Sequence, residues 1–262
     1  MPLTFIMDLG EGNVVKAECY KSLPSVVELA RTYAKAGRPD RFVVFSEEQT
    51  KYSACGELLP ENKEEKGVYL SIILRPSIFP SQASFLGALS AVSLVTALEE
   101  HTSKKLGLGW ISDVYCEGKK IGGTYTEGML DKYTSYEYVI VSFAVKLSDN
   151  DFPPRLTDLI KQVFASENNS IAFIIAKNIL SKFFAFYPNS LKSPEKMMDL
   201  YKKKFILEGT RIHYFDNGKR RRAKILSVDS SMGTLIVSTK GGVVKHLASP
   251  RGVSIPRKIR IK

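Results

Sequence analysis

The chain has 262 residues, of which 44% are hydrophobic and 25% charged. It is therefore long enough to bury a sizeable core, and its composition excludes extended disorder. Cys19, Cys55 and Cys116 are scattered and form no CxxC pair, which argues against a disulfide framework or a structural zinc site and favours the cytoplasm. The net charge of +11 raises nucleic acid or an acidic protein as a partner.

No segment has the character expected of a membrane span. The longest apolar runs, residues 85–98 and 171–187, are interrupted by Ser, Lys or Asn and fall short of the roughly 20 residues that a span needs. The first ten residues carry Asp8 and no basic stretch, unlike a signal peptide. We expect a soluble protein with no membrane contact, in which both runs form buried helices.

The first half of the chain predicts a mixture of strands and helices. Strands are expected at residues 12–20, 41–46 and 67–74, and helices at residues 24–36 and 81–101. The first helix places its apolar residues on one face and stops at Gly37 and Pro39. Between the second and third strands, residues 49–66 are polar and irregular, a loop of the length that is commonly functional.

The second half continues this mixture of strands and helices and then changes to short strands only. Strands are expected at residues 109–116, 121–127 and 136–147, followed by helices at 156–164 and 171–186. A third helix should end at Lys204, with Ser193 as its N-cap and Pro194 as its first residue. Short strands at residues 211–214, 224–228, 234–238 and 243–247 then predict a small antiparallel barrel. The resulting domains are residues 1–206 and 207–262.

Four sequence strings occur in the order and spacing found in biotin–protein ligases. They are FSEEQT at residues 45–50, GVYLS followed by LRP at 67–76, LGLGWISDV at 106–114 and GKKIGG at 118–123. Together with residues 209–249 they resemble that family over nearly the whole chain. The resemblance implies an α+β fold: a biotin/lipoate ligase-like mixed sheet with helices, followed by a small C-terminal SH3-like β-barrel.

The resemblance also implies a reaction and a site. Ligases of this family join biotin to ATP with Mg²⁺ and transfer the biotinyl group from biotinyl-5′-adenylate to a lysine of a biotin carboxyl carrier protein. Dimers are frequent among them, so the resemblance allows a homodimer. The positions that match ligand-binding residues of the family are Ser22, Gln49, Trp110, Asp113, Lys120, Gly122 and Gly123. Each also has a structural interpretation, such as a core tryptophan, a solvated hairpin lysine or a close strand crossing.

The chain departs from the family pattern at four places. The arginine-rich adenylate loop is replaced by KYSACGELL at residues 51–59, and the reactive-site lysine position is Gly109. The Ser-Thr-Asn triplet becomes SLP at 22–24, and the Gly-Ile-Gly-Ile-Asn strand becomes SFAVK at 142–146. Because a lysine does not replace the two-pronged donor of arginine, we expect adenylation to be lost or altered.

Three functional hypotheses remain. The first is a pseudoenzyme that still docks an acidic carrier protein. The second is an active but divergent ligase that uses Lys51, Lys120 and Lys146. The third is a nucleic-acid-binding module built on the basic run at residues 219–222, which is less favoured because strand alternation should turn either Tyr214 or Phe215 inward.

Two structural expectations follow from these departures. Phe143, or its neighbour Ala144, should project into the space where the family holds biotin or adenine, because glycines leave room that side chains fill. The loop at residues 51–66 lacks the arginines and glycines that order on a phosphate. It should therefore not become ordered when biotin and ATP are added.

Overall fold

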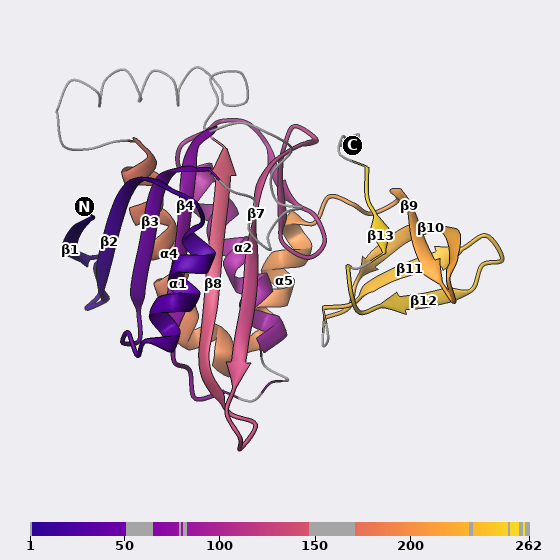
Figure 1. Ribbon diagram of the computed structural model, residues 1–262. Coiled ribbons are helices and arrows are strands. Elements are labelled where there is room, and N and C mark those ends of the chain that lie inside the picture. Colours follow the sequence, from indigo (N-terminus) through magenta and orange to yellow (C-terminus); the bar gives the residue numbers. More distant parts are fainter. Residues whose placement is uncertain are drawn as a thin grey trace.

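The computed structural model describes residues 2–50, 65–78, 80, 83–146, 171–230, 233–250, 252–256 and 259. These residues form two sheets: an eight-stranded mixed sheet, and a five-stranded sheet beside it that is built from the C-terminal segment (Figure 1). In the described ranges, no helix is long and apolar enough to cross a membrane.

The eight-stranded sheet has the order β1-β2-β3-β4-β8-β7-β6-β5. Its strands are β1 (Leu3–Asp8), β2 (Val14–Leu23), β3 (Phe42–Gln49), β4 (Glu65–Leu74), β5 (Leu106–Leu108), β6 (Asp113–Cys116), β7 (Lys119–Leu130) and β8 (Tyr136–Lys146). Strands β2 and β3 are parallel because helix α1 (Val26–Lys35) connects them. The other neighbouring pairs are antiparallel.

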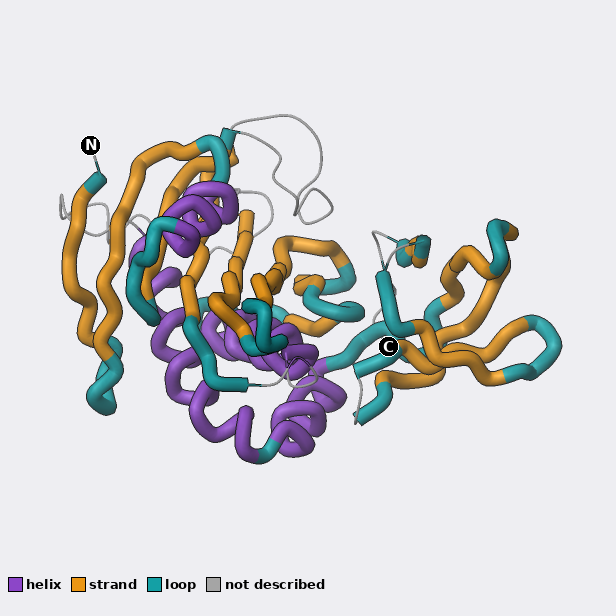
Figure 2. The backbone as a smooth tube through the Cα atoms, turned by 60° about the horizontal axis from the view of Figure 1, so that its bottom comes forward, coloured by secondary structure: helices purple, strands orange, loops and turns teal. Residues whose placement is uncertain are grey.

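Helices cover both faces of this sheet (Figure 2). Helix α1 lies on one face and buries Val26, Val27, Ala30 and Ala34 against it. Helices α2 (Ala83–Glu99), α4 (Ile171–Lys192) and α5 (Pro194–Lys204) lie on the other face. Because α2 packs against the sheet and against α4 and α5, it is apolar on nearly every side, as a buried helix requires.

The C-terminal sheet is antiparallel and has the order β12-β11-β10-β9-β13. Its strands are β9 (Arg211–Asp216), β10 (Lys219–Val228), β11 (Leu235–Thr239), β12 (Val244–Leu247) and β13 (Val253–Ser254). Asn217 and Gly218 join β9 to β10 with positive φ angles of 49° and 72°, which suits a two-residue hairpin turn. The sheet is consistent with the expected SH3-like barrel; the domain boundary at residues 206 and 207 stays a prediction.

The expected fold class is confirmed, with corrections to individual elements. Strand β1 was not predicted from the sequence, and the single strand expected at residues 109–116 is wrong, because a turn at 109–112 separates β5 from β6. Ser193 is the N-cap of α5 as expected, although its side chain makes no capping hydrogen bond. The helix expected at 156–164 lies outside the described residues.

Direct contacts join the two sheets. The indole Nε1 of Trp110 donates a hydrogen bond to the carbonyl oxygen of Gly233 at 2.9 Å. The backbone N–H of Ile259 donates to the carbonyl oxygen of Gly118, also at 2.9 Å. The C-terminal sheet is thus attached to the turn between β5 and β6 and to the turn between β6 and β7.

Candidate functional site

Five residues form one transverse row across the sheet on the face that α1 covers. The strand registers align Asp113 of β6, Gly123 of β7, Ala144 of β8, Tyr69 of β4 and Ser46 of β3. Directly opposed residues share a face of a sheet, and Tyr69 and Ala144 belong to the buried cluster that includes the α1 residues. Two of the predicted ligand residues, Asp113 and Gly123, therefore lie on the α1 face.

Gln49, at the end of β3, is engaged by the start of α1. Its Oε1 accepts a hydrogen bond from the backbone N–H of Val26 at 3.1 Å, and Ser25 Oγ accepts one from Glu28 N–H at 3.3 Å. These bonds satisfy N–H groups that the first turn of a helix leaves without an internal partner. Ser22 lies just before α1 and is exposed. Gln49 thus has a structural role at the N-terminus of α1.

Lys120 faces a carboxylate. Its Nζ lies 2.8 Å from Asp113 Oδ1, and the two side chains are 20% and 21% exposed. The hairpin between β6 and β7 brings these residues together, because Glu117 and Gly118 turn the chain through positive φ angles of 49° and 81°. The ammonium group is held at the end of the row, beside Gly123, which is the register partner of Asp113.

Gly122 is required by the pairing of β7 with β8. A Cβ atom at this position would overlap the carbonyl oxygen of Ala144 and come within 3.0 Å of Val145 Cα. Because both are backbone atoms, no side-chain rotation could make room. The close strand crossing that the sequence offered as an alternative therefore accounts for this glycine.

Trp110 lies apart from the row. It is 3% exposed and belongs to the hydrophobic cluster on the side of α2, α4 and α5, which extends into the C-terminal sheet. The Tyr201 hydroxyl of α5 lies 2.6 Å and 2.8 Å from the carbonyl oxygens of Gly109 and Ile111. The turn that carries Trp110 is thus held by α5 on one side and by Gly233 on the other.

The position of the family's reactive-site lysine is closed. A Cβ atom at Gly109 would lie 2.7 Å from Tyr115 Cε2 and 3.1 Å from Asp113 Cβ. Tyr115 is buried, and burial, followed by the charge of Asp113, raises the pKa of its hydroxyl. A ring fixed in the core occupies the space where any side chain at residue 109 would begin.

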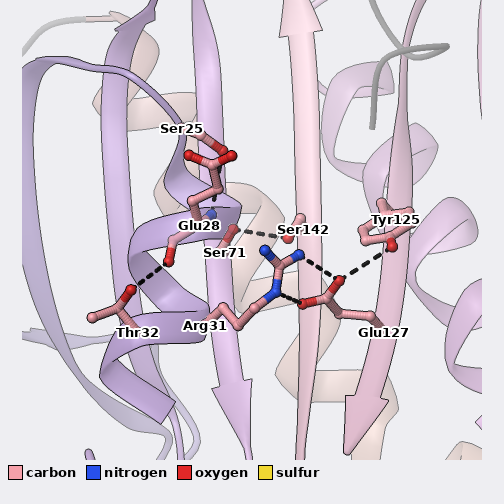
Figure 3. A network of polar contacts seen from close by, with 8 residues as sticks. All are labelled: Ser25, Glu28, Arg31, Thr32, Ser71, Tyr125, Glu127 and Ser142. Atoms are coloured by element: carbon pink, nitrogen blue, oxygen red, sulfur yellow. Dashed lines mark hydrogen bonds and ion pairs between the residues drawn. The ribbon is translucent and has the colours of Figure 1, made fainter. Parts of the chain in front are cut away.

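Further polar residues on the α1 face were missed from the sequence (Figure 3). Arg31 of α1 donates from Nε and Nη2 to both carboxylate oxygens of Glu127 on β7, at 2.8 Å each, and Tyr125 donates to Glu127 at 3.2 Å. The hydrogen bond that Arg31 donates to Glu127 is the main cause of the raised pKa of Arg31. No local sequence signal links residues 96 positions apart.

Ser71 and Ser142 form a pair beneath α1. Ser142 lies two residues before Ala144 on β8, and Ser71 is its register partner on β4. Ser71 Oγ and Ser142 Oγ are 2.8 Å apart, and both side chains are buried. The sequence could have indicated them, because Ser71 ends the GVYLS string and Ser142 replaces a family glycine. Ser142 thus adds a hydroxyl, paired with that of Ser71, at a position where the resemblance implies a glycine.

Phe143 and Ala144, the two residues expected to fill ligand space, lie on opposite faces of the sheet. Phe143 points to the face covered by α2, α4 and α5, where its ring lies 5.9 Å from that of Phe183, and so away from the row on the α1 face. Ala144 lies on the α1 face, between Gly123 and Tyr69 in the row. The expectation that its methyl group fills space where the family holds biotin or adenine stays a prediction.

The described residues of the row supply no cationic side chain for a nucleoside triphosphate. A triphosphate requires several cationic donors, usually with Mg²⁺. The five residues of the row include no cation, and the ammonium of the neighbouring Lys120 faces Asp113. Over the described ranges, no group of three or more His, Cys, Asp or Glu could hold a metal ion. The prediction for the loop at 51–66 concerns residues that are largely outside the described ranges.

The curated proteins to which this chain is similar are bifunctional ligase/repressor proteins. No protein-family model matches the chain. The bifunctional ligase/repressor BirA of Bacillus subtilis (strain 168) is 26% identical over 228 residues, which cover 85% of this chain and 69% of that protein. BirA of Bacillus spizizenii is 24% identical with the same coverage.

Solved structures share the fold. The biotin protein ligase from Aquifex aeolicus in complex with biotin and ATP has a TM-score of 0.63 and 18% identity, covering 92% of this chain and 99% of that chain. A biotin protein ligase-like protein of unknown function from Silicibacter sp. TM1040 has a TM-score of 0.64 and 12% identity, covering 94% and 97%. With its motif order, its fold and its curated relatives in agreement, this chain belongs to the biotin–protein ligase family as a divergent member without the adenylate-loop arginines or the reactive-site lysine.

Proposed function

We propose that this protein is a biotin–protein ligase homologue that no longer forms biotinyl-adenylate and that still binds a carrier protein. The observation that carries the proposal is the closed position at Gly109, where a Cβ atom would lie 2.7 Å from the ring of Tyr115. A lysine cannot be regained there by a single substitution unless a buried ring moves. The loss is therefore built into the packing around the site.

The state of the other candidate residues supports the same proposal. Gln49 caps the N-terminus of α1, Gly122 serves the pairing of β7 with β8, and Trp110 binds the C-terminal sheet. Lys120 is ion-paired with Asp113. These five retained family residues thus each have a structural contact that explains their presence without a nucleotide.

The chemical requirements of adenylation also support the proposal. A carboxylate approaching the phosphates of ATP brings negative charges together, so catalysis requires preorganised cationic groups around them. In this chain the segment after Thr50 has Lys51 and Glu57 where the family has several arginines. A single lysine supplies neither the charge nor the two-pronged geometry of those arginines.

A carrier protein is the partner that family membership supports. The family acts on biotin carrier proteins, so a carrier domain is the partner that the relatives of this chain imply. We infer that the protein binds a biotin carboxyl carrier domain and does not modify it. It would act there as a binding or scaffolding protein.

The test separates adenylation from carrier binding. The full-length protein is incubated with biotin, MgATP and a purified biotin carboxyl carrier domain, and pyrophosphate release and biotinylation of the carrier are measured. The biotin protein ligase from Aquifex aeolicus serves as the positive control. Isothermal titrations with biotin, ATP, biotinyl-adenylate and the unmodified carrier domain are run in parallel.

We expect no pyrophosphate, no biotinylated carrier and measurable binding of the carrier domain. Turnover of biotin and ATP would contradict the loss of adenylation and would make the protein an active, divergent ligase. If the titration with the carrier domain releases no heat of binding, the binding role is contradicted. The loss of adenylation is not affected by that result.

A further inference from the structure

The positive charge of this protein is concentrated in its C-terminal segment. Residues 207–262 contain thirteen Lys and Arg but three Asp and Glu, a net charge of +10, out of 38 and 27 in the whole chain. Residues 1–206 therefore contain 25 basic and 24 acidic side chains and are almost neutral. A basic excess confined to one short segment is typical of a polyanion-binding region.

Within the C-terminal sheet, β9 and β10 present their basic residues on one face. The antiparallel register pairs Arg211 with Lys224, His213 with Arg222 and Phe215 with Arg220. Directly opposed residues share a face, and alternate residues of a strand recur on it roughly every 6.6 Å. We name these six residues the β9–β10 face; five of them are exposed, and His213 is half-buried.

Among the described residues, no carboxylate forms an ion pair with the cations of this face. The described ion pairs include none made by Arg211, Arg220, Arg222 or Lys224. The carboxylate of the hairpin, Asp216, pairs with Lys245 at 2.6 Å and alternates with the residues of the β9–β10 face. The charge on this face is therefore directed to solvent and available to a ligand.

An aromatic ring completes the face. The side chain of Phe215 is 61% exposed, whereas its neighbour Tyr214 is buried in the interior of the sheet at 4%. The backbone N–H of Phe215 donates a hydrogen bond to the carbonyl oxygen of Gly252 at 3.1 Å, which holds the backbone that carries the ring. An exposed, backbone-supported ring next to Arg220 is a platform on which an unstacked base can lie.

We propose that the β9–β10 face binds single-stranded nucleic acid, with the cations of β10 and Arg211 on successive phosphates and Phe215 under a base. The regular spacing of the cations favours a polymer that carries one negative charge in each repeating unit. Carboxylates on a folded protein surface have no such repeat, and an acidic protein would not require the exposed ring. For the β9–β10 face alone, these features favour nucleic acid over an acidic carrier protein, which the sequence had ranked first.

The test is a salt titration of oligonucleotide binding by the full-length protein. Fluorescein-labelled oligo(dT) and oligo(U) of about 20 nucleotides, long enough to span such a face, are the probes, with a duplex of the same length for comparison. The test variant carries Arg220→Ala, Arg222→Ala and Lys224→Ala. The matched control carries Lys16→Ala, Lys21→Ala and Lys35→Ala, which remove the same charge from exposed positions of the first sheet and α1.

We expect the test variant to bind single strands at least about tenfold more weakly and to reduce the slope of log K against log salt by about 2, for three lost phosphate contacts. The control variant should keep the slope of the unmodified protein. Phe215→Leu should weaken binding at least about fivefold and leave the slope unchanged, because stacking releases no counterions. The ratio of oligo(U) to oligo(dT) affinity then distinguishes RNA from DNA as the source of the strand.

Three results would overturn the proposal. One is equal loss of binding in the test and control variants, which would indicate attraction to net charge alone. Another is duplex binding as tight as single-strand binding. The third is a test variant that loses an acidic carrier domain but leaves oligonucleotide binding unchanged. Unaltered thermal unfolding midpoints would show that the exposed substitutions leave the fold intact.

Discussion

Tyr115 and Gly109 face each other across the β5–β6 turn, so closely that the edge of the Tyr115 ring lies 2.7 Å from where a Cβ atom of residue 109 would stand. The ring is buried, and the hydroxyl of Tyr201 holds the carbonyl oxygen of Gly109 at 2.6 Å from the opposite side. The glycine is thus fixed between two tyrosines that come from different elements.

Gly109→Ala should therefore destabilise the protein by about 1–3 kcal/mol, the usual cost of overpacking a core. Urea unfolding followed by circular dichroism measures the change. Gly87→Ala in α2 is the matched control, because its Cβ atom would meet Ile111 Cγ2 at an ordinary 3.6 Å and alanine favours a helix. A smaller cost at 109 than at 87 would show that the Tyr115 ring moves freely.

Trp110→Phe should weaken the attachment between the two sheets. The substitution removes the hydrogen bond to Gly233 and should cost about 1 kcal/mol, a typical net value for such a bond. Scanning calorimetry should show a lower or broader transition for the C-terminal sheet. Trp110 is also the single tryptophan of the chain, so its fluorescence in the unmodified protein should shift to the red as this contact opens. A red-shifted emission from the native protein would contradict the burial of Trp110.

The Arg31–Glu127 pair should couple α1 to β7. Because the two side chains are 32% and 20% exposed, solvent screens the interaction and we expect a coupling energy of about 1 kcal/mol. A double-mutant cycle of Arg31→Gln and Glu127→Gln by urea unfolding measures it. Arg31→Lys keeps the charge but loses the two-pronged bond, so it should recover part of the energy at most. Full recovery with lysine would show that charge alone matters.

The thiol of Cys19 should make stability depend on alkaline pH. Burial, followed by the charge of Glu47, raises its pKa from 9.0 to about 12. The unfolded chain therefore releases this proton first, so the contribution to stability is complete below about pH 9 and is lost as the pH rises towards 12. Unfolding free energies between pH 8 and about 11 should fall more steeply in the unmodified protein than in Cys19→Ala. Parallel slopes would contradict a buried, protonated thiol.

The order of the predicted elements agreed with the structure wherever local pattern was sufficient. The apolar face of α1 and the buried run in β4 depend on residues close in sequence, and both were predicted. Strand β1 was missed because Leu3 and Ile6 are exposed at 72% and 74%, so its apolar residues do not alternate with the faces of the sheet. The break at residues 109–112 was missed because Tyr201, about ninety residues later, holds that turn.

The candidate site was harder to predict than the fold for the same reason. Family strings identified Asp113, Lys120 and Gly123, which the structure brings together at one end of the row. No pattern could show that the partner of Trp110 is a carbonyl group 123 residues away. Nor could the string at 106–114 reveal that Tyr115, just after it, fills the space beside Gly109.

The hydrogen bond from Ile259 to Gly118 has a mechanical consequence for the C-terminal sheet. The chain enters that sheet from α5 through residues 205–210, and its end returns to the β6–β7 turn of the first sheet. The hydrogen bond from Trp110 to Gly233 is a third attachment, and a body held at three separate points cannot rotate without breaking one of them. A molecule held on the β9–β10 face would therefore be presented to the β6–β7 hairpin at a nearly constant distance and angle, and a partner could not pull the sheet aside without first detaching Ile259.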